Sequence, residues 1–194
     1  MRKMITVKIN GEERQYPQGA TYEDVANDYQ QEYENLIALA ARDGKIRELF
    51  KKLTRDCEVT FFTLKDDVGN KTYVRSATML FLKAVFDVYG REAAQSCRVE
   101  FAIGNGSYIS PRGQIAATED NAAKIRDRMR ELVEAKTPFL KRSYSLDNAM
   151  ELFHKEGMED KEKLFRYRRG SFVNIYEMDG YYDYYYGYML PNAG

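Results

Sequence analysis

The sequence predicts an α+β protein of two domains, one at residues 4–63 and the other at residues 70–194. In the first stretch, short apolar strands surround a single helix, whereas longer amphipathic helices and tyrosine-rich strands fill the rest. A short polar run over 66–70 lies between the two patterns and predicts the domain boundary. A chain of 194 residues is long enough to bury a real core.

The first domain opens with a predicted β-hairpin. Apolar and polar residues alternate over Ile5–Ile9, which is the period of a half-buried strand. Asn10-Gly11 predicts a hairpin turn, because both residues tolerate a positive φ, and Arg14–Tyr16 then forms the return strand.

One helix and two further strands complete this domain. Thr21 is a candidate N-cap with an acidic residue three positions later, so a helix is predicted from there to about Tyr33. Short apolar runs over 36–39 and 57–64 predict buried strands. A strand, a hairpin, a helix and more strands within so short a stretch indicate a β-grasp arrangement.

The second domain begins with a densely apolar run over Ser76–Tyr89, which predicts a largely buried helix. A hairpin is predicted over Arg98–Ser110, with its turn at Gly104-Asn105-Gly106. Thr118 opens a long charged helix, and Ser145 caps a further one. Additional strands are predicted over residues 139–144, 164–167, 172–176 and 181–188.

The composition excludes several classes of protein. The thirty basic and thirty acidic side chains give no net charge, which argues against a protein that binds nucleic acid mainly through an excess of positive charge. The single histidine, His154, excludes a site that needs two imidazoles and is predicted to be an ordinary surface or capping residue. Cys57 and Cys97 are predicted to be small core residues with reduced thiols. The sequence has no apolar run long enough to span a membrane, so we expect a cytoplasmic protein. It also has no phosphate-loop motif, and we expect few catalytic residues.

Several segments resemble a known pair of domains. Residues 4–63, with Tyr16–Thr21 followed by Glu23–Ala26, resemble the TGS domain, a β-grasp module of threonyl-tRNA synthetases and related regulatory proteins. Residues 71–194 resemble the second additional domain of threonyl- and alanyl-tRNA synthetases, which in those enzymes hydrolyses mischarged tRNA. The segments that carry this second resemblance are Arg75–Leu80, Ile103–Tyr108, Gly170–Val173 and Asp183–Gly194.

The editing domain of that family holds a metal ion through a His-x-x-x-His pair on one helix, with a Cys and a His near its end. By the resemblance, these four ligand positions fall on Arg75, Met79, Tyr185 and Met189. Arg does not release its proton to bind a metal, and Met and Tyr are poor ligands for zinc. Without ligands no activated water forms, so the resemblance implies no catalytic residue, no metal and no cofactor in this chain.

A TGS module followed by such a degenerate domain resembles the N-terminal half of a group of bacterial proteins that end in a uridine-kinase-like ATPase. The tail Tyr186–Pro191 resembles the junction in those proteins. This resemblance implies a non-catalytic regulatory or ligand-binding fragment of a nucleoside-kinase-like protein, whose partner is the kinase domain of the same polypeptide. ATP and Mg²⁺ are then expected only for that missing kinase domain.

Two other functions stay open at this point. The first is an RNA- or tRNA-binding N-terminal fragment of a threonyl-tRNA synthetase-like protein, and the second is an active deacylase, which predicts bound zinc. The tyrosine-rich tail is predicted to be a half-buried strand and no platform for bases, because residues 171–194 contain no Lys or Arg to contact phosphate.

A small anionic ligand is a further expectation, without any membrane partner. Arg75 is one candidate clamp for it, although pairing with Asp183 or another carboxylate is the default expectation for a partly buried guanidinium. The densest basic cluster gives the remaining candidates, which are Arg166, Arg168 and Arg169.

Overall fold

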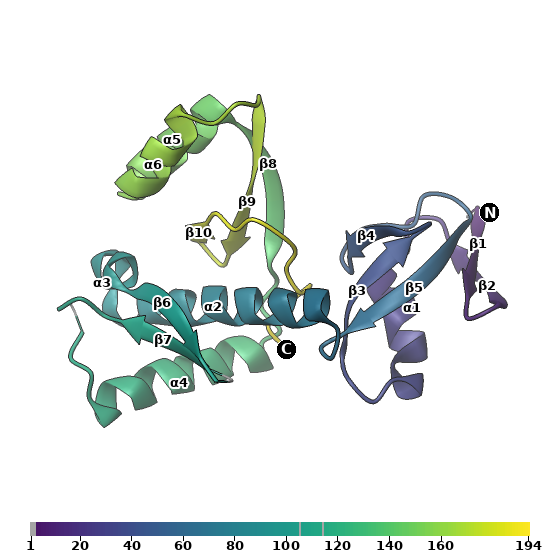
Figure 1. The fold of residues 1–194 in the computed structure, drawn as a ribbon, viewed down its shortest axis with the longest axis horizontal. Helices are drawn as coiled ribbons and strands as arrows, with labels where there is room; N and C mark the ends of the chain where they lie inside the picture. The colour runs from purple at the N-terminus through teal and green to yellow at the C-terminus, as the bar shows by residue number, and fades with distance from the viewer. Residues whose placement is uncertain (1–2, 105, 114) are drawn as a thin grey trace. The chain divides into compact units, whose positions relative to one another are not determined.

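The computed structural model describes residues 3–104, 106–113 and 115–194, and Figure 1 labels the helices and strands. Its mixture of sheets and helices confirms the predicted α+β class. The chain forms two compact units, the first of residues up to Ser76 together with Gly187–Pro191. The second unit contains Ala77–Tyr186 and Asn192–Gly194, and helix α2 (Asp67–Tyr89) begins in the first unit and continues in the second.

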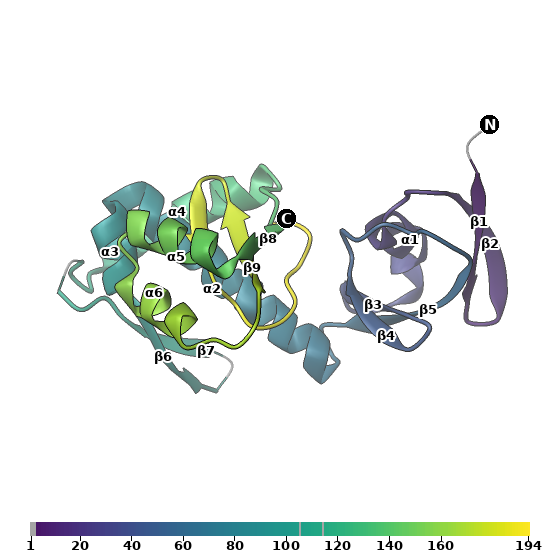
Figure 2. The same cartoon turned by 90° about the horizontal axis from the view of Figure 1, so that it is seen from above.

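The first unit is built on a five-stranded sheet with the strand order β2-β1-β5-β3-β4. The central strand β5 is parallel to its neighbour β1, and the other neighbouring strands are antiparallel. Figure 2 shows β1 and β2 as the outer hairpin of this sheet. The strands are β1 (Met4–Ile9), β2 (Glu12–Pro17), β3 (Ile37–Arg42), β4 (Lys45–Glu48) and β5 (Cys57–Thr63).

Helix α1 (Tyr22–Tyr29) begins where the sequence predicts it. The Thr21 hydroxyl accepts a hydrogen bond from the Asp24 backbone N–H at 3.1 Å, and the Asp24 carboxylate accepts one from the Thr21 N–H at 2.7 Å. This reciprocal capping satisfies two donors that the helix leaves free. The apolar core of the unit lies between this helix and the sheet and includes Ile5, Val7, Ile9, Val25, Leu53 and Phe61.

Two local features of the first unit differ from the prediction. Strand β4 was not predicted, because its four residues, Lys45–Glu48, carry a single apolar side chain and so no alternation. The polar run at 66–70 is no break, because α2 begins at Asp67. A Cβ on Gly69 would lie 1.9 Å from the carbonyl oxygen of Thr63, so the glycine allows the helix to start directly after β5.

The second unit combines helices with two small antiparallel sheets. One sheet has the order β10-β9-β8, and the other is the β6–β7 hairpin. Its strands are β6 (Arg98–Ile103), β7 (Gly106–Ser110), β8 (Leu140–Ser145), β9 (Phe172–Met178) and β10 (Tyr181–Asp183). The predicted turn residue Asn105 lies outside the described residues.

The helices of the second unit after α2 are α3 (Arg91–Ser96), α4 (Glu119–Glu134), α5 (Leu146–Lys155) and α6 (Glu159–Arg166). Thr118 and Ser145 cap α4 and α5 as predicted. Helix α3 was not predicted. None of the helices in the described part of the chain combines the length and the apolar character that crossing a bilayer requires.

Near the C-terminus, one predicted strand is wrong and another is too long. Residues 164–167 lie in α6 and its C-cap, because ion pairs one helical turn apart join Lys163 to Glu159 and Arg166 to Glu162. Only Phe165 of this helix is buried, so its apolar period is too short to recognise. The strand predicted over 181–188 ends at Asp183, whose carboxylate binds the next backbone N–H and draws it out of the ladder.

Candidate functional site

Two of the four implied metal-ligand positions belong to the first unit. The Arg75 guanidinium donates a hydrogen bond to the carbonyl oxygen of Tyr188 at 2.6 Å. This contact is with a backbone carbonyl, whereas the expected partner was a carboxylate. Met189 is fully buried, and its sulfur accepts a hydrogen bond from the Ser76 hydroxyl at 3.5 Å. Neither a guanidinium nor a thioether is a good ligand for zinc.

The other two positions belong to the second unit. Met79 is fully buried. The hydroxyl of Tyr185 is buried without a hydrogen-bond partner among the described residues, and burial, followed by the charge of Asp183, raises its pKa well above the usual value. A phenol that stays protonated is a poor metal ligand. Across the described residues, no three His, Cys, Asp or Glu side chains are grouped so that they could hold a metal ion.

Asp183 is the centre of a buried polar group in the second unit. Its carboxylate accepts hydrogen bonds from the Tyr184 backbone N–H at 2.6 Å and from the Tyr181 hydroxyl at 3.4 Å, and it forms an ion pair with Lys161. A buried carboxylate requires such compensation. Burial, followed by the charge of Asp183, raises the pKa of Tyr181 well above its usual value, so this hydroxyl remains a donor.

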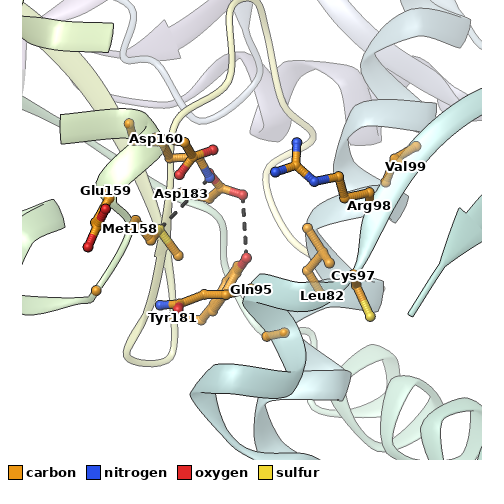
Figure 3. A pocket seen from close by; sticks show the side chains of 13 residues that line it. Leu82, Gln95, Cys97, Arg98, Val99, Met158, Glu159, Asp160, Tyr181 and Asp183 are labelled. Carbon is orange, nitrogen blue, oxygen red and sulfur yellow. Dashed lines mark hydrogen bonds and ion pairs between the residues drawn. The ribbon is translucent and has the colours of Figure 1, made fainter. Parts of the chain in front are cut away.

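A cavity of about 470 Å³ opens beside this group. In Figure 3, Arg98 reaches in from one side, and Asp160 and Asp183 lie across from it. Both signs of charge therefore face the same space, whose size is typical of a site for a small molecule or a single nucleotide. The polar residues on its walls are Gln95, Arg98, Glu159, Asp160, Lys161 and Asp183.

Helix α3 holds one wall of the cavity by binding the end of α5. The Arg91 guanidinium donates to the carbonyl oxygen of Lys155 at 2.9 Å and pairs with the Glu156 carboxylate at 3.0 Å, while the Gln95 amide donates to the Glu156 carbonyl. These donors satisfy carbonyl groups that a helix C-terminus leaves without partners. They thereby place Gly157–Met158, which line the cavity.

Lys83 of α2 anchors the turn before β10, the strand that carries the wall residues Tyr181 and Asp183. Its buried ammonium donates to the Asp87 carboxylate at 2.7 Å and to the carbonyl oxygen of Asp179 at 2.6 Å. Asp179 stands in the turn between β9 and β10 with a φ of +44°. Because β10 is a three-residue edge strand, this anchor helps to fix Tyr181 and the residues that follow it.

The cysteines and the histidine do not provide a nucleophile here. Cys97 lines the cavity, but burial raises the pKa of its thiol, which disfavours the reactive thiolate. Cys57 lies half-buried in the first unit, where burial again raises the thiol pKa. His154 is exposed near the end of α5, as predicted, with its Nδ1 at 3.0 Å from the Glu162 carboxylate.

The β6–β7 hairpin presents an exposed aromatic pair. Phe101 and Tyr108 are cross-strand neighbours whose ring centroids lie 5.2 Å apart with nearly parallel planes. Their side chains are 58% and 48% exposed, and Ile103 is 59% exposed. Apolar side chains gathered on an uncovered two-stranded ribbon mark an interaction surface. Arg98, which lines the cavity, begins the same hairpin.

The predicted arginine cluster lies at the end of α6 and in the loop that follows it. Arg166 is paired with Glu162 at 2.6 Å, and Arg168 donates to the hydroxyl of Tyr184. Arg169 is the next residue of the loop. These arginines belong to the second unit, whereas Arg75 belongs to the first.

The residues that form the cavity were not assigned a role from the sequence. No sequence motif includes Arg98, Asp160 or Lys161. Part of the helix that carries Lys161 was predicted to be a strand. The one available signal was Asp183, which lies in a segment that resembles the editing domain.

No protein-family model matches this chain. The threonine–tRNA ligase of Thermotoga neapolitana is 27% identical over 199 residues, which cover 99% of this chain and 29% of the relative. The chain is distantly similar to threonine–tRNA ligases. The ligase of Maricaulis maris is 26% identical over 98% of this chain and 30% of its own length. The ligase of Porphyromonas gingivalis is 24% identical over 95% of this chain and 28% of its own length.

The similarity runs through both units and fits the resemblance seen in the sequence. The chain spans less than a third of the length of these curated relatives. Their names favour the synthetase-like alternative over the nucleoside-kinase parent that was expected first, for which these relatives provide no evidence.

Proposed function

We propose that this chain is the RNA-recognition region of a threonyl-tRNA synthetase-like protein, and that it binds the end of an RNA strand without hydrolysing it. The observation that carries the proposal is one hairpin that joins two features. Arg98 lines the polar cavity, and the stacked rings of Phe101 and Tyr108 stand exposed on the same hairpin.

These features suit an unpaired RNA end. Exposed aromatic rings stack on bases, and an arginine beside them contacts phosphate. The cavity is large enough for a terminal nucleotide. Similarity to threonine–tRNA ligases supports tRNA as the class of RNA. Because the chain has no net charge, binding depends on these local contacts, and we expect modest affinity.

The absence of hydrolysis follows from the side chains at the former ligand positions. Arg75 and Met189 are engaged by a backbone carbonyl and a serine hydroxyl, and Met79 and Tyr185 offer a thioether and a protonated phenol. Lys161, the cation nearest Asp183, is held in an ion pair with that carboxylate. These side chains are poor zinc ligands, which supports a domain that activates no water for hydrolysis.

The strand order β2-β1-β5-β3-β4, in which β1 and β5 are parallel, supports a TGS-like β-grasp module within residues 4–63. Similarity to the ligases over nearly the whole chain supports an editing-like domain within residues 70–194. Both assignments are part of this proposal.

A second candidate is the regulatory fragment of a nucleoside-kinase-like protein, whose kinase domain would be its partner in the same polypeptide. The loss of the four ligand positions favours a parent that does not edit tRNA. A phosphate-loop motif in the coding sequence after Gly194 would support this candidate, and a synthetase catalytic domain there would remove it.

Fluorescence anisotropy with a labelled RNA stem-loop tests the proposal. We expect tighter binding when the stem ends in a single-stranded 3′ CCA than when it is blunt. Phe101→Ala and Tyr108→Ala should each weaken binding by about 5- to 100-fold, the effect of removing one stacked base contact. Val133→Ala, which removes another exposed apolar side chain of the second unit, is the control and should bind as the wild type does.

Equal affinity for both RNAs, or hairpin variants that bind as well as the control, would overturn the proposal. Hydrolysis is tested separately with a mischarged tRNA. We expect its ester half-life to be the same with and without the protein, also after zinc is added, and zinc-dependent acceleration would contradict the non-catalytic assignment.

A further inference from the structure

The segment that joins α6 to β9, which can be located in Figure 1, is rich in cationic residues, although the chain is neutral overall. Residues 163–172 contain four cationic side chains and no Asp or Glu. The cationic residues are Lys163, Arg166, Arg168 and Arg169.

The structure divides these cations into two kinds. Two of them pair with carboxylates one turn earlier on α6. The Lys163 ammonium lies 3.3 Å from the Glu159 carboxylate, and the Arg166 guanidinium lies 2.6 Å from the Glu162 carboxylate. Their charges are compensated within the helix.

The other two cations keep their charge uncompensated. Arg168 donates to the hydroxyl of Tyr184 and lies 5.4 Å from the centre of its ring, so its partner is neutral. Among the described residues, no carboxylate forms an ion pair with Arg168 or Arg169. The Arg168 backbone N–H donates to the Phe165 carbonyl at 3.2 Å, which fixes the turn that presents both guanidinium groups.

Exposed aromatic side chains flank Arg168 and Arg169 in the sequence. Tyr167 is 86% exposed, and Phe172 is 67% exposed. Leu164, one helical turn before Tyr167, is 53% exposed. Large apolar side chains that gather on the surface with this much exposure mark a site where a partner binds.

Two unpaired arginines flanked by exposed rings fit a single-stranded nucleic acid, which offers phosphates to the arginines and bases to the rings. Arginine is suited to this contact because its planar group binds phosphate in a bidentate manner and stacks on bases. The carboxylates of an acidic peptide would pair with the arginines, but such a peptide has no planar bases to stack on the exposed rings.

We propose that the segment Leu164–Phe172 is a second RNA-contact surface, in which Arg168 and Arg169 bind phosphates and Tyr167 stacks on a base. This inference rests on the proposed function for its choice of RNA as the ligand. It adds a surface that belongs to a different element from the aromatic hairpin.

The test measures RNA affinity by anisotropy over a salt series. Arg169→Gln should lower the slope of log K against log salt by about 0.7 for single-stranded RNA, since one phosphate contact is lost. Tyr167→Ala should weaken binding by about 5-fold or more at every salt concentration and leave the slope unchanged. Arg130→Gln is the matched control, because it removes another exposed arginine, one that is paired with Asp127 on α4.

Circular dichroism melting of each variant checks that the fold is intact. If Arg169→Gln and Tyr167→Ala behave as Arg130→Gln does while the Phe101 variant loses binding, this inference fails and the proposed function stands. If the segment variants lose binding and the hairpin variants do not, the segment is the RNA surface and the hairpin assignment fails. Wild-type protein that binds no RNA overturns both, and Arg169-dependent binding of oligoglutamate would then assign the segment to an acidic partner.

Discussion

Replacing Lys83 by Met tests whether buried charge holds the wall of the cavity. The side chain is only 3% exposed, and its ammonium contacts the Asp87 carboxylate at 2.7 Å, the Asp179 carbonyl at 2.6 Å and the Asp179 carboxylate at 3.2 Å. An ammonium group has three N–H donors, so each donor has an acceptor. Met keeps the length of the stem and removes every donor.

The expected loss follows from what each acceptor retains. Asp87 keeps the Arg128 guanidinium at 2.9 Å, and the Asp179 carboxylate, whose side chain is 65% exposed, is solvated by water. The Asp179 carbonyl loses its donor from α2. A fully broken buried pair costs ~3–5 kcal/mol, so we expect the lower end of this range. That corresponds to a fall in the melting temperature of the second unit by ~10–20 °C.

The assay is urea and thermal unfolding followed by circular dichroism. Lys124→Met is the control, because Lys124 pairs with Asp120 at the same spacing and the same 2.7 Å distance, with both side chains exposed. We expect no resolvable change in the control. Asp179→Asn, which keeps the carbonyl acceptor, should retain most of the stability. If Lys83→Met is as stable as Lys124→Met, the buried network does not hold the wall.

Three further predictions concern single contacts. Tyr29→Phe should be as stable as the wild type, or more stable by about 1 kcal/mol in urea unfolding, because the buried Tyr29 hydroxyl has no hydrogen-bond partner among the described residues. A clear loss of stability would refute this. Gly187→Ala should destabilise the first unit, because a Cβ would lie 2.6 Å from the Arg75 Cζ at a φ of +135°, and adding Arg75→Ala should restore only part of the loss in thermal melting. Hydrogen bonds from His154, followed by those from Arg166, lower the pKa of Glu162 in the folded protein. The stability that this carboxylate contributes is therefore complete above its unfolded pKa of about 4.3, and it is lost as the pH falls through the lower folded pKa. His154→Ala should therefore raise the pKa of Glu162 in an NMR titration and flatten the fall of stability on the acid side, and an unchanged pKa would contradict the assignment.

The features that the sequence predicted correctly are those encoded by neighbouring residues. The alternation over Ile5–Ile9 and the Asn10-Gly11 turn specify the first hairpin, which has the predicted position. The capping box at Thr21 and Asp24 lies within four residues, so the start of α1 could be predicted from local chemistry.

Elements with a weak apolar signal were missed or wrongly assigned. Helix α6 buries only Phe165, and its helical conformation is supported by ion pairs that polar residues form one turn apart. The polar residues at 66–70 indicated a break, yet the close approach that Gly69 permits makes them the start of α2. Polarity alone does not distinguish a loop from an exposed helical turn.

The sequence by itself determined the α+β class and the capped helices, and the family resemblance implied four positions without metal ligands. The tertiary structure decided which charges meet: Lys83 reaches Asp179 across 96 positions and Lys161 reaches Asp183 across 22. Local periodicity reports which face of an element is buried, but a contact between two elements depends on how they pack. The cavity and its charged walls therefore become visible only once the chain is folded.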